Sequence, residues 1–352
     1  MSRFFSDKFA SLVPYTPGEQ PKDRQFIKLN TNESPFAPSE KAQKAAAEAA
    51  VNLQLYPDPE CRLLTKAVAD TLGVDPEEVL LTNGSDEILN FAFMAYCDEK
   101  HPAVFPDITY GFYPVFAKIN QVPYEEIPLR EDFSINISDY LGLGKTIFIA
   151  NPNAPTGLFL PPAEIEEIVK SNPDSVVVVD EAYVDFGAES CVPLTRKYDN
   201  LLVTQTFSKS RSMAGARLGF GVGNRALIQD LNTIKYSTNP YNINSMTMAA
   251  GLGVLADKDY FAENCRTIAD NRAYTSRALS DLGFSVTDSR ANFLFAKHPA
   301  FPGDTLYKKL REKGILVRHF TLSRIADYNR ITVGSRRDME TLIRTITELL
   351  EG

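Results

Sequence analysis

Residues 201–220 read LLVTQTFSKSRSMAGARLGF, and this stretch decides the fold class. It opens with an apolar run of strand character and ends in a polar turn that carries Lys209, with Arg217 eight residues later. Open α/β sheets bind their ligands at the carboxyl ends of the strands, so we expect Lys209 to lie at such a site. Burial there would lower the pKa of the amine, and a neutral amine can form a Schiff base with a carbonyl. A lysine in a solvated loop is the alternative interpretation.

Two runs upstream end in polar residues in the same way. The run TIFIA at 146–150 leads into NPNAPTG, and SVVVV at 175–179 leads into DEAY. Continuous Val and Ile runs favour strands that are buried on both faces of a parallel sheet. A helical pattern over 161–170 fills the connection between them. Because the carboxyl ends of parallel strands meet at one edge, we expect the three polar ends to lie together.

These ends supply a carboxylate, a phenol and a lysine, which is the set that pyridoxal phosphate needs. Asp180 can pair with the pyridinium nitrogen and keep the ring an electron sink. Tyr183 can form a hydrogen bond with the phenolic oxygen of the ring. Ser208 and Arg217 can hold the phosphate, because the arginine fork suits a dianion. The pattern therefore predicts pyridoxal 5'-phosphate as the cofactor, bound to Lys209.

The motifs Asn-Pro-x-x-Pro-Thr-Gly, Asp-Glu-Ala-Tyr and Ser-Lys, with an arginine eight positions after the lysine, resemble those of the fold-type-I pyridoxal-phosphate aminotransferases. Within that family, the similarity to the histidinol-phosphate aminotransferases extends over nearly the whole chain. One position departs from the family pattern. The family usually has an asparagine directly before Pro-Thr-Gly, where this chain has Ala154. Asn153, or Tyr183 with a water, is then expected to bond the ring oxygen.

The resemblance implies two domains. Residues 31–245 would form the large cofactor-binding domain, an α/β fold with a mainly parallel sheet flanked by helices. Residues 1–30, an arm containing several prolines, would join residues 246–352 in a small domain. Alternating helix and strand patterns over the last 70 residues suit a small α+β domain.

The turn Gly84-Ser85-Asp86 follows a short strand pattern at 79–82 and precedes a helical pattern. Backbone N–H groups and the positive end of a helix dipole make such a turn a phosphate site. Ser85 or Asp86 as a simple helix cap is the alternative. The resemblance also assigns Tyr110 to the face of the cofactor ring, and Tyr56 to the cofactor phosphate of a neighbouring subunit, which implies a homodimer. Simple packing is the alternative for Tyr56.

Four residues are candidates for substrate binding. The resemblance places Tyr15 near a substrate phosphate and Asn32 in the substrate pocket. The resemblance assigns Arg330 to the α-carboxylate of the amino donor, which suits the geometry of its fork. Arg318 is a candidate for the substrate phosphate. Arg324 is a weaker candidate for the phosphate. The alternatives are a plain surface arm for Tyr15 and solvated positions for the arginines.

The composition is that of an ordinary globular chain with room for one large and one smaller domain: 352 residues, 44% of them hydrophobic and 23% charged. A net charge of −8 argues against non-specific binding to nucleic acid or to an anionic membrane surface. No apolar stretch approaches the ~18 residues that span a bilayer, and we see no signal peptide. The chain has three histidines, and its four cysteines are far apart without a Cys-x-x-Cys, so we expect no metal site and a cytoplasmic location. The cysteines are Cys61, Cys97, Cys191 and Cys265.

The resemblance implies a homodimeric aminotransferase of L-histidine biosynthesis that moves an amino group between histidinol phosphate and 2-oxoglutarate. Lys209 would hold the cofactor and then carry a proton as general base and acid. One alternative is the same chemistry on an aromatic amino acid, and another is a lyase similar to threonine-phosphate decarboxylase. A regulator with an aminotransferase-like domain would need a basic DNA-binding module, for which neither end has the length or the charge.

Overall fold

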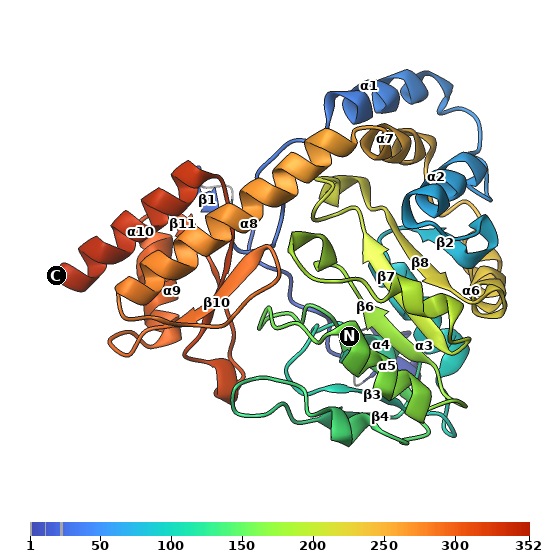
Figure 1. Ribbon diagram of the computed structural model, residues 1–352, viewed down its shortest axis with the longest axis horizontal. Helices are drawn as coiled ribbons and strands as arrows, with labels where there is room; N and C mark the ends of the chain where they lie inside the picture. The colour runs from blue at the N-terminus through green and yellow to red at the C-terminus, as the bar shows by residue number, and fades with distance from the viewer. Residues whose placement is uncertain (1, 11, 22–23) are drawn as a thin grey trace.

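The computed structural model describes residues 2–10, 12–21 and 24–352, so residues 1, 11, 22 and 23 of the predicted arm lie outside the described part. Figure 1 shows a large domain built on one broad sheet and a small domain that carries the C-terminus. The long helix α8 (Lys258–Asp281) runs from one to the other.

The large domain contains a seven-stranded sheet in the order β2-β8-β7-β6-β5-β3-β4. β8 is antiparallel to both of its neighbours, and the remaining pairs are parallel. The predicted, mainly parallel sheet is therefore confirmed. The strands are β2 (Val79–Thr82), β3 (Ala103–Pro106), β4 (Tyr124–Ile127), β5 (Thr146–Ala150), β6 (Val177–Asp180), β7 (Leu201–Thr206) and β8 (Gly219–Gly223).

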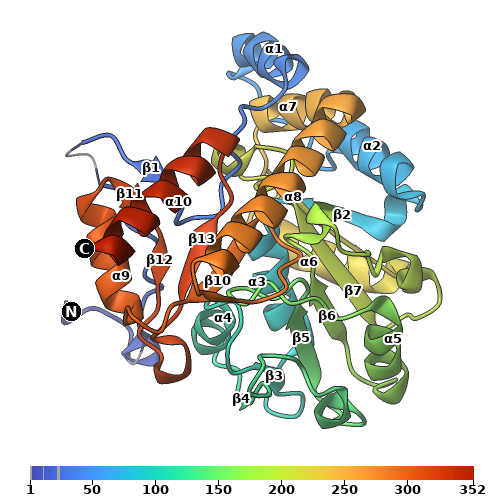
Figure 2. The ribbon, with the colours of Figure 1, turned by 60° about the vertical axis from the view of Figure 1, so that its left-hand side comes forward.

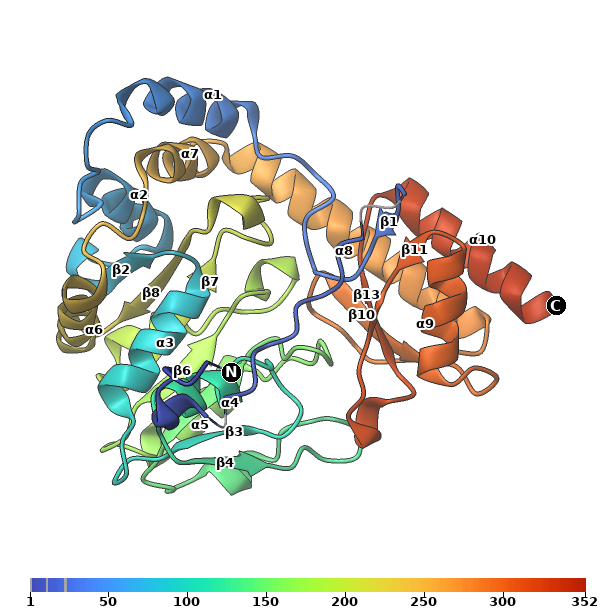
Figure 3. The same ribbon diagram turned by 180° about the vertical axis from the view of Figure 1, so that it is seen from behind.

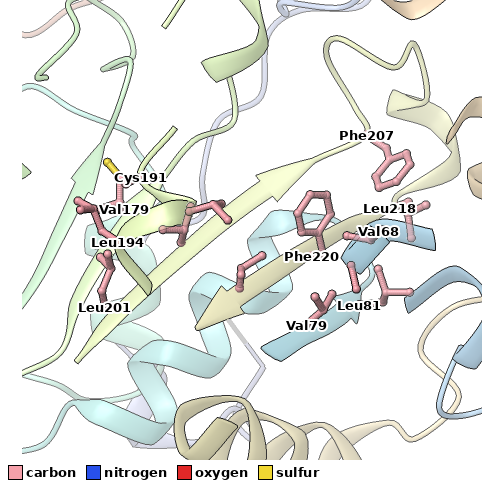
Figure 4. Packing of buried hydrophobic residues seen from close by; sticks show 14 of the residues in the cluster. Val68, Val79, Leu81, Val179, Cys191, Leu194, Leu201, Phe207, Leu218 and Phe220 are labelled. Carbon is pink, nitrogen blue, oxygen red and sulfur yellow. The ribbon is translucent and has the colours of Figure 1, made fainter. Parts of the chain in front are cut away.

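Both faces of this sheet are covered, which explains the unbroken apolar runs. Successive side chains of a strand point to opposite faces, and each face has its own core. Val177, Val179 and Val203 belong to one core, whereas Val178 and Leu202 belong to the other. Figure 4 shows part of the first core, where Phe207, Leu218 and Phe220 gather near Val68 of α2.

In the described part of the chain, seven α-helices precede α8 and lie around the sheet. Helix α7 packs against α1 and α2, as Figures 1 and 3 both show. A Cβ on Gly253 of α7 would lie 2.6 Å from the Cα of Ala42 in α1, so the close approach requires glycine. The helices are α1 (Glu40–Ala49), α2 (Arg62–Leu72), α3 (Ser85–Tyr96), α4 (Tyr113–Ile119), α5 (Pro162–Ser171), α6 (Arg225–Thr238) and α7 (Ser245–Leu255).

The small domain has a four-stranded antiparallel sheet in the order β12-β13-β10-β9 and a two-stranded parallel sheet of β1 and β11. Helices α8, α9 and α10 cover these strands around a separate core, and α10 lies along the outside in Figure 2. The predicted small α+β domain is confirmed. The arm contributes β1, which pairs with β11, and the predicted domain bounds stay a prediction. Its elements are β1 (Ile27–Lys28), β9 (Ser285–Val286), β10 (Phe293–Lys297), α9 (Gly303–Glu312), β11 (Ile315–Leu316), β12 (Arg318–His319), β13 (Asn329–Thr332) and α10 (Arg336–Glu351).

The two domains meet through a small apolar cluster and an ion pair. The cluster joins Phe133 and Ile108 of the large domain to Phe295 of the small domain. Nη1 of Arg324 lies 2.6 Å from a carboxylate oxygen of Asp107. Arg324 is thus used in holding the domains together and does not line the cavity described below.

The division between residues 245 and 246 stays a prediction. The packing of α7 on α1 and α2 favours a later boundary, because residues 245–255 contribute to the large-domain core. The sequence pattern over 245–282 predicts one long helix, and this prediction is wrong. It breaks between α7 and α8, where Asp257 leaves helical geometry at φ −115° and ψ 62°.

Candidate active site

A cavity of about 370 Å³ lies at the carboxyl edge of the large sheet. It collects most of the residues that the sequence singles out, and it also reaches residues of the N-terminal arm. Side chains from strand ends, from the start of α3 and from the arm form its wall. Its lining is Gln20, Thr31, Glu33, Ser85, Asp86, Tyr110, Ala150, Ala154, Asp180, Ala182, Tyr183, Thr206, Ser208, Lys209, Ala214, Gly215 and Arg217.

Asp180 is the last residue of β6 and lies beside Ala150 of β5 and Thr204 of β7 in the sheet register. Its carboxylate is buried at the floor of the cavity. One oxygen accepts a hydrogen bond from the backbone N–H of Ala182 at 3.1 Å. Burial, together with the nearby charge of Asp86, raises the pKa of Asp180 from 3.8 to about 7. A cation bound beside this carboxylate would favour its ionised form.

Tyr113 is a functional neighbour that the sequence did not reveal, because its position suggested only core packing. It is fully buried at the start of α4, and its hydroxyl donates a hydrogen bond to the other carboxylate oxygen of Asp180 at 3.3 Å. Asp180 is thus held between a backbone donor and a phenol. The Tyr-x-x-Tyr spacing of Tyr110 and Tyr113 is the signal that could have indicated this pair.

Lys209 follows β7 in a loop that is anchored at Phe207, whose N–H bonds the carbonyl of Leu218 and whose carbonyl accepts from Met213. The ammonium nitrogen lies 3.4 Å from the carbonyl oxygen of Thr31 and 5.8 Å from the ring centre of Tyr183. Burial and then the charge of Arg330 lower the pKa of Lys209 from 10.5 to about 8. The structure thus brings the expected nucleophile, Lys209, into the cavity, where its lowered pKa makes the neutral amine easier to form.

The turn at the start of α3, which the sequence predicts to be a phosphate site, borders the cavity with two serines and an arginine. Gly84 has φ +80°, and a Cβ there would lie 2.7 Å from Nη2 of Arg217, so the turn requires glycine. Ser85, Ser208 and Arg217 face the cavity around this turn. Nη1 of Arg217 lies 3.4 Å from the hydroxyl of Ser208. The first N–H groups of a helix have no partner inside the helix, so they are free to bind a phosphate.

The side chain of Asp86 is bonded to other residues of the site and does not face a phosphate. One of its carboxylate oxygens accepts from the hydroxyl of Tyr110 at 2.7 Å, and the other lies 3.2 Å from Nη2 of Arg217. The side chain therefore orients the tyrosine and the arginine, and only the backbone N–H of Asp86 remains for an anion. Tyr110 lines the cavity, where its ring can cover the face of a ligand.

Asn153 is not brought into the cavity, although the sequence offered it as a substitute for the family asparagine. Its amide NH₂ donates to the carbonyl of Ile108 and to Thr156, both at 3.0 Å, and its oxygen accepts from Thr109 at 2.8 Å. These bonds use its side chain within the loop. Ala154 lines the cavity instead and offers no polar side-chain atom there.

Tyr183 lies across the cavity, and Asn32 donates to its hydroxyl oxygen at 3.0 Å. Asn32 is buried and is bonded in turn to the hydroxyl of Thr332 in β13. Both predicted residues are therefore at the site, and Asn32 acts on Tyr183. Glu33, which the sequence analysis passed over, also lines the cavity and is paired with Lys28 at 2.6 Å.

The predicted substrate residues Arg330, Arg318 and Tyr15 come from the small domain and the arm. Nη2 of Arg330 donates to the carbonyl of Asn30 at 3.0 Å, while its buried Nε has no hydrogen-bond partner among the described residues. Burial lowers the pKa of Arg330. Arg318 donates to the carbonyls at 16 and 17 of the arm. None of the three lines the cavity. Among the described residues, neither arginine forms an ion pair with a carboxylate.

Tyr56 does not reach the cavity of its own chain. It is 82% exposed and stacks on Tyr241 with ring centres 4.6 Å apart. Its role thus stays a prediction that needs a second subunit.

The family of class I and II aminotransferases matches residues 24–346. The chain belongs to the class I and II aminotransferases. It is 48% identical to the histidinol-phosphate aminotransferase of Brachyspira hyodysenteriae, with 100% of both chains covered. It is also 48% identical to histidinol-phosphate aminotransferase 2 of Dechloromonas aromatica, with 99% of each covered. As an aminotransferase, the protein is a transferase.

Solved structures show the same fold. The structure of histidinol-phosphate aminotransferase from Sinorhizobium meliloti in complex with pyridoxal-5'-phosphate has a TM-score of 0.90 at 23% identity, and 99% of each chain is covered. L-threonine-O-3-phosphate decarboxylase from Porphyromonas gingivalis has a TM-score of 0.80 at 22% identity, covering 93% of this chain and 100% of that one. Aminotransferases and a decarboxylase therefore share this fold, and the fold alone does not choose between the two reactions.

The residues of this aminotransferase fit pyridoxal phosphate. Their chemistry suits that molecule from end to end. The turn at the start of α3 would hold its phosphate, Tyr110 would cover its ring face, Asp180 would pair with its ring nitrogen, Tyr183 would bond its ring oxygen and Lys209 would meet its carbonyl carbon. The raised pKa of buried Asp180 supports the same match. A protonated ring nitrogen is a cation, and beside Asp180 it would favour the ionised carboxylate. Among the described residues no cluster of metal-ligand side chains occurs and no helix is long and apolar enough to cross a membrane.

Proposed function

We propose that this aminotransferase uses pyridoxal 5'-phosphate to move an amino group between histidinol phosphate and 2-oxoglutarate, forming imidazole acetol phosphate and glutamate in the biosynthetic direction of L-histidine synthesis. Full-length identity of 48% to proteins named histidinol-phosphate aminotransferase supports the pair of substrates. The observation that carries the proposal is the pair of arginines, Arg318 and Arg330, which lack carboxylate partners within the described chain and lie near Tyr15.

These arginines suit a donor that bears a phosphate and also an acceptor that bears carboxylates. An arginine fork binds either group with two parallel hydrogen bonds. The carbonyl of Asn30 accepts from Nη2 of Arg330, so the rest of the guanidinium fork would have to receive the substrate anion. We therefore assign the anionic end of both substrates to Arg330, with Arg318 and Tyr15 at the mouth of the site.

When bound, pyridoxal phosphate supplies a carbonyl carbon that takes up the amino group and a ring that draws electrons away from the bond to the α-proton. The chain supplies the proton transfer. Lys209 is partly desolvated, and its pKa of about 8 allows it to take a proton from the substrate Cα and to give one back near neutral pH. Asp180, clamped by Ala182 and Tyr113, holds a positive charge on the ring nitrogen.

We also propose a homodimer. The segment 51–63 exposes large apolar side chains in one short stretch, and single exposed apolar residues are ordinary whereas a gathered set indicates an interface. Tyr56 lies within it, where a second subunit could receive it. The exposed members are Val51, Leu53, Leu55, Tyr56 and Leu63. Leu55→Glu is expected to convert a dimer into monomers in light-scattering measurements, and a wild-type monomer would refute this proposal. The cytoplasm stays the expected location.

The first test of function is an absorbance titration of the cofactor-loaded protein with histidinol phosphate. Conversion of the visible band without 2-oxoglutarate supports the donor half-reaction, and Lys209→Ala should abolish turnover while the fold remains. A band that ignores histidinol phosphate but responds to phenylalanine or tyrosine would show that the substrate is wrong. Release of carbon dioxide from a phosphorylated amino acid would identify a lyase. Absence of colour with added cofactor would refute the role of Lys209.

A further inference from the structure

The ring-oxygen end of the cavity has an unusual wall. Ala154 faces the cavity where the family pattern has an asparagine, and the amide of Asn153 is used inside its own loop. Tyr183 therefore remains as the side-chain donor for the ring oxygen of the cofactor. The direction of its O–H proton then matters, because a phenol that gives its proton to a protein acceptor cannot give it to the ring.

Two buried residues determine that direction. The hydroxyl of Thr332 accepts a hydrogen bond from the backbone N–H of Asn32 at 3.0 Å. Its own proton is then available for the side-chain oxygen of Asn32, which lies 3.1 Å away. With its oxygen filled, the asparagine turns its NH₂ toward Tyr183, at 3.0 Å from the phenolic oxygen.

An NH₂ group can only donate, so the oxygen of Tyr183 must accept this bond. The proton of the phenol is left without an acceptor in the chain Thr332–Asn32–Tyr183, and Tyr183 lines the cavity. We propose that Thr332 and Asn32 are positioning residues that direct the O–H proton of Tyr183 into the cavity, toward the ring oxygen of the cofactor. This inference rests on the proposed function, because it needs pyridoxal phosphate at the site.

The surrounding bonds keep the hydrogen-bond chain Thr332–Asn32–Tyr183, here called the relay, in one arrangement. Asn32 and Thr332 are each at most 2% exposed, so bulk water does not compete for their bonds. The amide of Asn292 donates to the backbone carbonyl of Asn32 at 3.0 Å. Asn32 has φ +56°, a left-handed conformation that asparagine tolerates better than most side chains. The backbone N–H of Thr332 is bonded to the carbonyl of Leu29. The arm and β13 thus hold both members from the backbone.

The test measures the pH midpoint at which the visible absorption band of the cofactor-loaded, substrate-free protein changes. In Thr332→Val the asparagine oxygen loses its donor and becomes an acceptor for Tyr183, so the ring oxygen loses its hydrogen bond. An anionic ring oxygen that has lost its hydrogen-bond donor attracts the proton on the nearby nitrogen of Lys209 more strongly. That proton is then released at a higher pH. We expect the midpoint to rise by about one to two pH units, the size of one hydrogen bond to a charged oxygen.

Matched variants separate the relay from packing. Thr332→Ser keeps the hydroxyl and should restore the wild-type midpoint. Thr275→Val removes an equally buried hydroxyl that bonds the carbonyl of Asn271 within α8, and it should leave the midpoint unchanged. Tyr183→Phe should raise the midpoint at least as far as Thr332→Val. Adding Thr332→Val to Tyr183→Phe should then give no further rise, because the two changes act through one proton.

A Thr332→Val protein with the wild-type midpoint would overturn the proposal, as would a shift that persists in full in the Tyr183→Phe background. If Thr332→Val does not fold, Thr332→Ala removes the same hydroxyl with less bulk and is judged by the same two results. A wild-type protein that shows no visible band with pyridoxal phosphate would instead overturn the proposed function.

Discussion

Gly219 offers the sharpest test of the proposed phosphate site at the turn that opens α3. It begins β8 and lies against the turn that opens α3. A Cβ at this position would lie 2.4 Å from the backbone nitrogen of Ser85 and 2.6 Å from the carbonyl carbon of Gly84. These are backbone atoms, so they cannot rotate away as a side chain would. Gly219→Ala must therefore displace the turn that presents its N–H groups to the cofactor phosphate.

The size of the effect follows from contact distances. Non-bonded heavy atoms need about 3.5 Å, so the turn must move by roughly 1 Å. A movement of that size takes a hydrogen bond from about 2.9 Å to nearly 4 Å, beyond its useful range. One hydrogen bond to a charged group contributes about 1.5–3 kcal/mol, which corresponds to about tenfold to 150-fold in affinity. We expect the Kd for pyridoxal phosphate to rise by that factor.

Equilibrium dialysis of the cofactor-free protein against pyridoxal phosphate measures this change, and circular dichroism checks the fold. Gly221→Ala is the matched control on the same strand. Its Cβ would meet the side chain of Ile88 at 3.0 Å, and a side chain can give way. It should affect stability more than cofactor affinity. A folded Gly219→Ala protein that binds the cofactor with wild-type affinity would refute the placement of the phosphate at this turn.

Three other changes test separate parts of the site. Tyr113→Phe removes a hydrogen-bond donor from Asp180 and should weaken cofactor binding about twofold to tenfold in dialysis. The buried hydroxyl of Tyr140 has no described partner, so Tyr140→Phe should leave cofactor binding unchanged. Equal effects of the two changes would contradict the role of Tyr113. Arg330→Ala should lower kcat/KM for histidinol phosphate by about 30-fold to several thousand-fold, as expected for 2–5 kcal/mol from a buried charged contact, and a smaller loss in steady-state assays would move the anion elsewhere. Burial raises the pKa of Glu181 from 4.5 to about 7, so the stability that its neutral form contributes is lost as the pH rises through this window. Urea unfolding of the cofactor-free protein should therefore show Glu181→Gln gaining on wild type between pH 4.5 and 7 and no further change above it, and a gain that is independent of pH would exclude this titration.

The carboxyl edge of the sheet could be predicted from the sequence because chain periodicity and chemistry agree there. Runs such as 175–179 have no alternation, so they specify strands covered on both faces, and the polar residue after each run then has one possible edge to occupy. Asp180 and Lys209 followed from this logic. The apolar pattern over 284–296 predicts one strand, but the structure has β9 and β10 with a loop between them. The turn-type residues Asp288, Ser289 and Asn292 in this loop are the signal that could have indicated the break.

The hydrogen-bond partners of the site could not be predicted in the same way. Tyr113 lies 67 residues before Asp180 in the chain, and Thr332 lies 300 residues after Asn32. No local pattern links such pairs, because they meet only after the domains have packed. Asn153 shows the converse case. The sequence placed it beside Ala154, but successive residues of a loop point in different directions, and its amide was satisfied locally by Thr109 and Ile108.

The strand β13 joins substrate binding to the cofactor ring. Arg330 and Thr332 are two residues apart in β13, so they share one face of the sheet. The partner segment repeats this spacing: Arg330 donates to the carbonyl of Asn30, and Thr332 is bonded to Asn32. A substrate anion bound to Arg330 would therefore contact the strand that carries Thr332, the residue that we propose directs the O–H proton of Tyr183. Our hypothesis is that anion binding shifts β13 and with it the Thr332–Asn32 bond. A pH midpoint of the visible band that inorganic phosphate leaves unchanged would exclude this coupling.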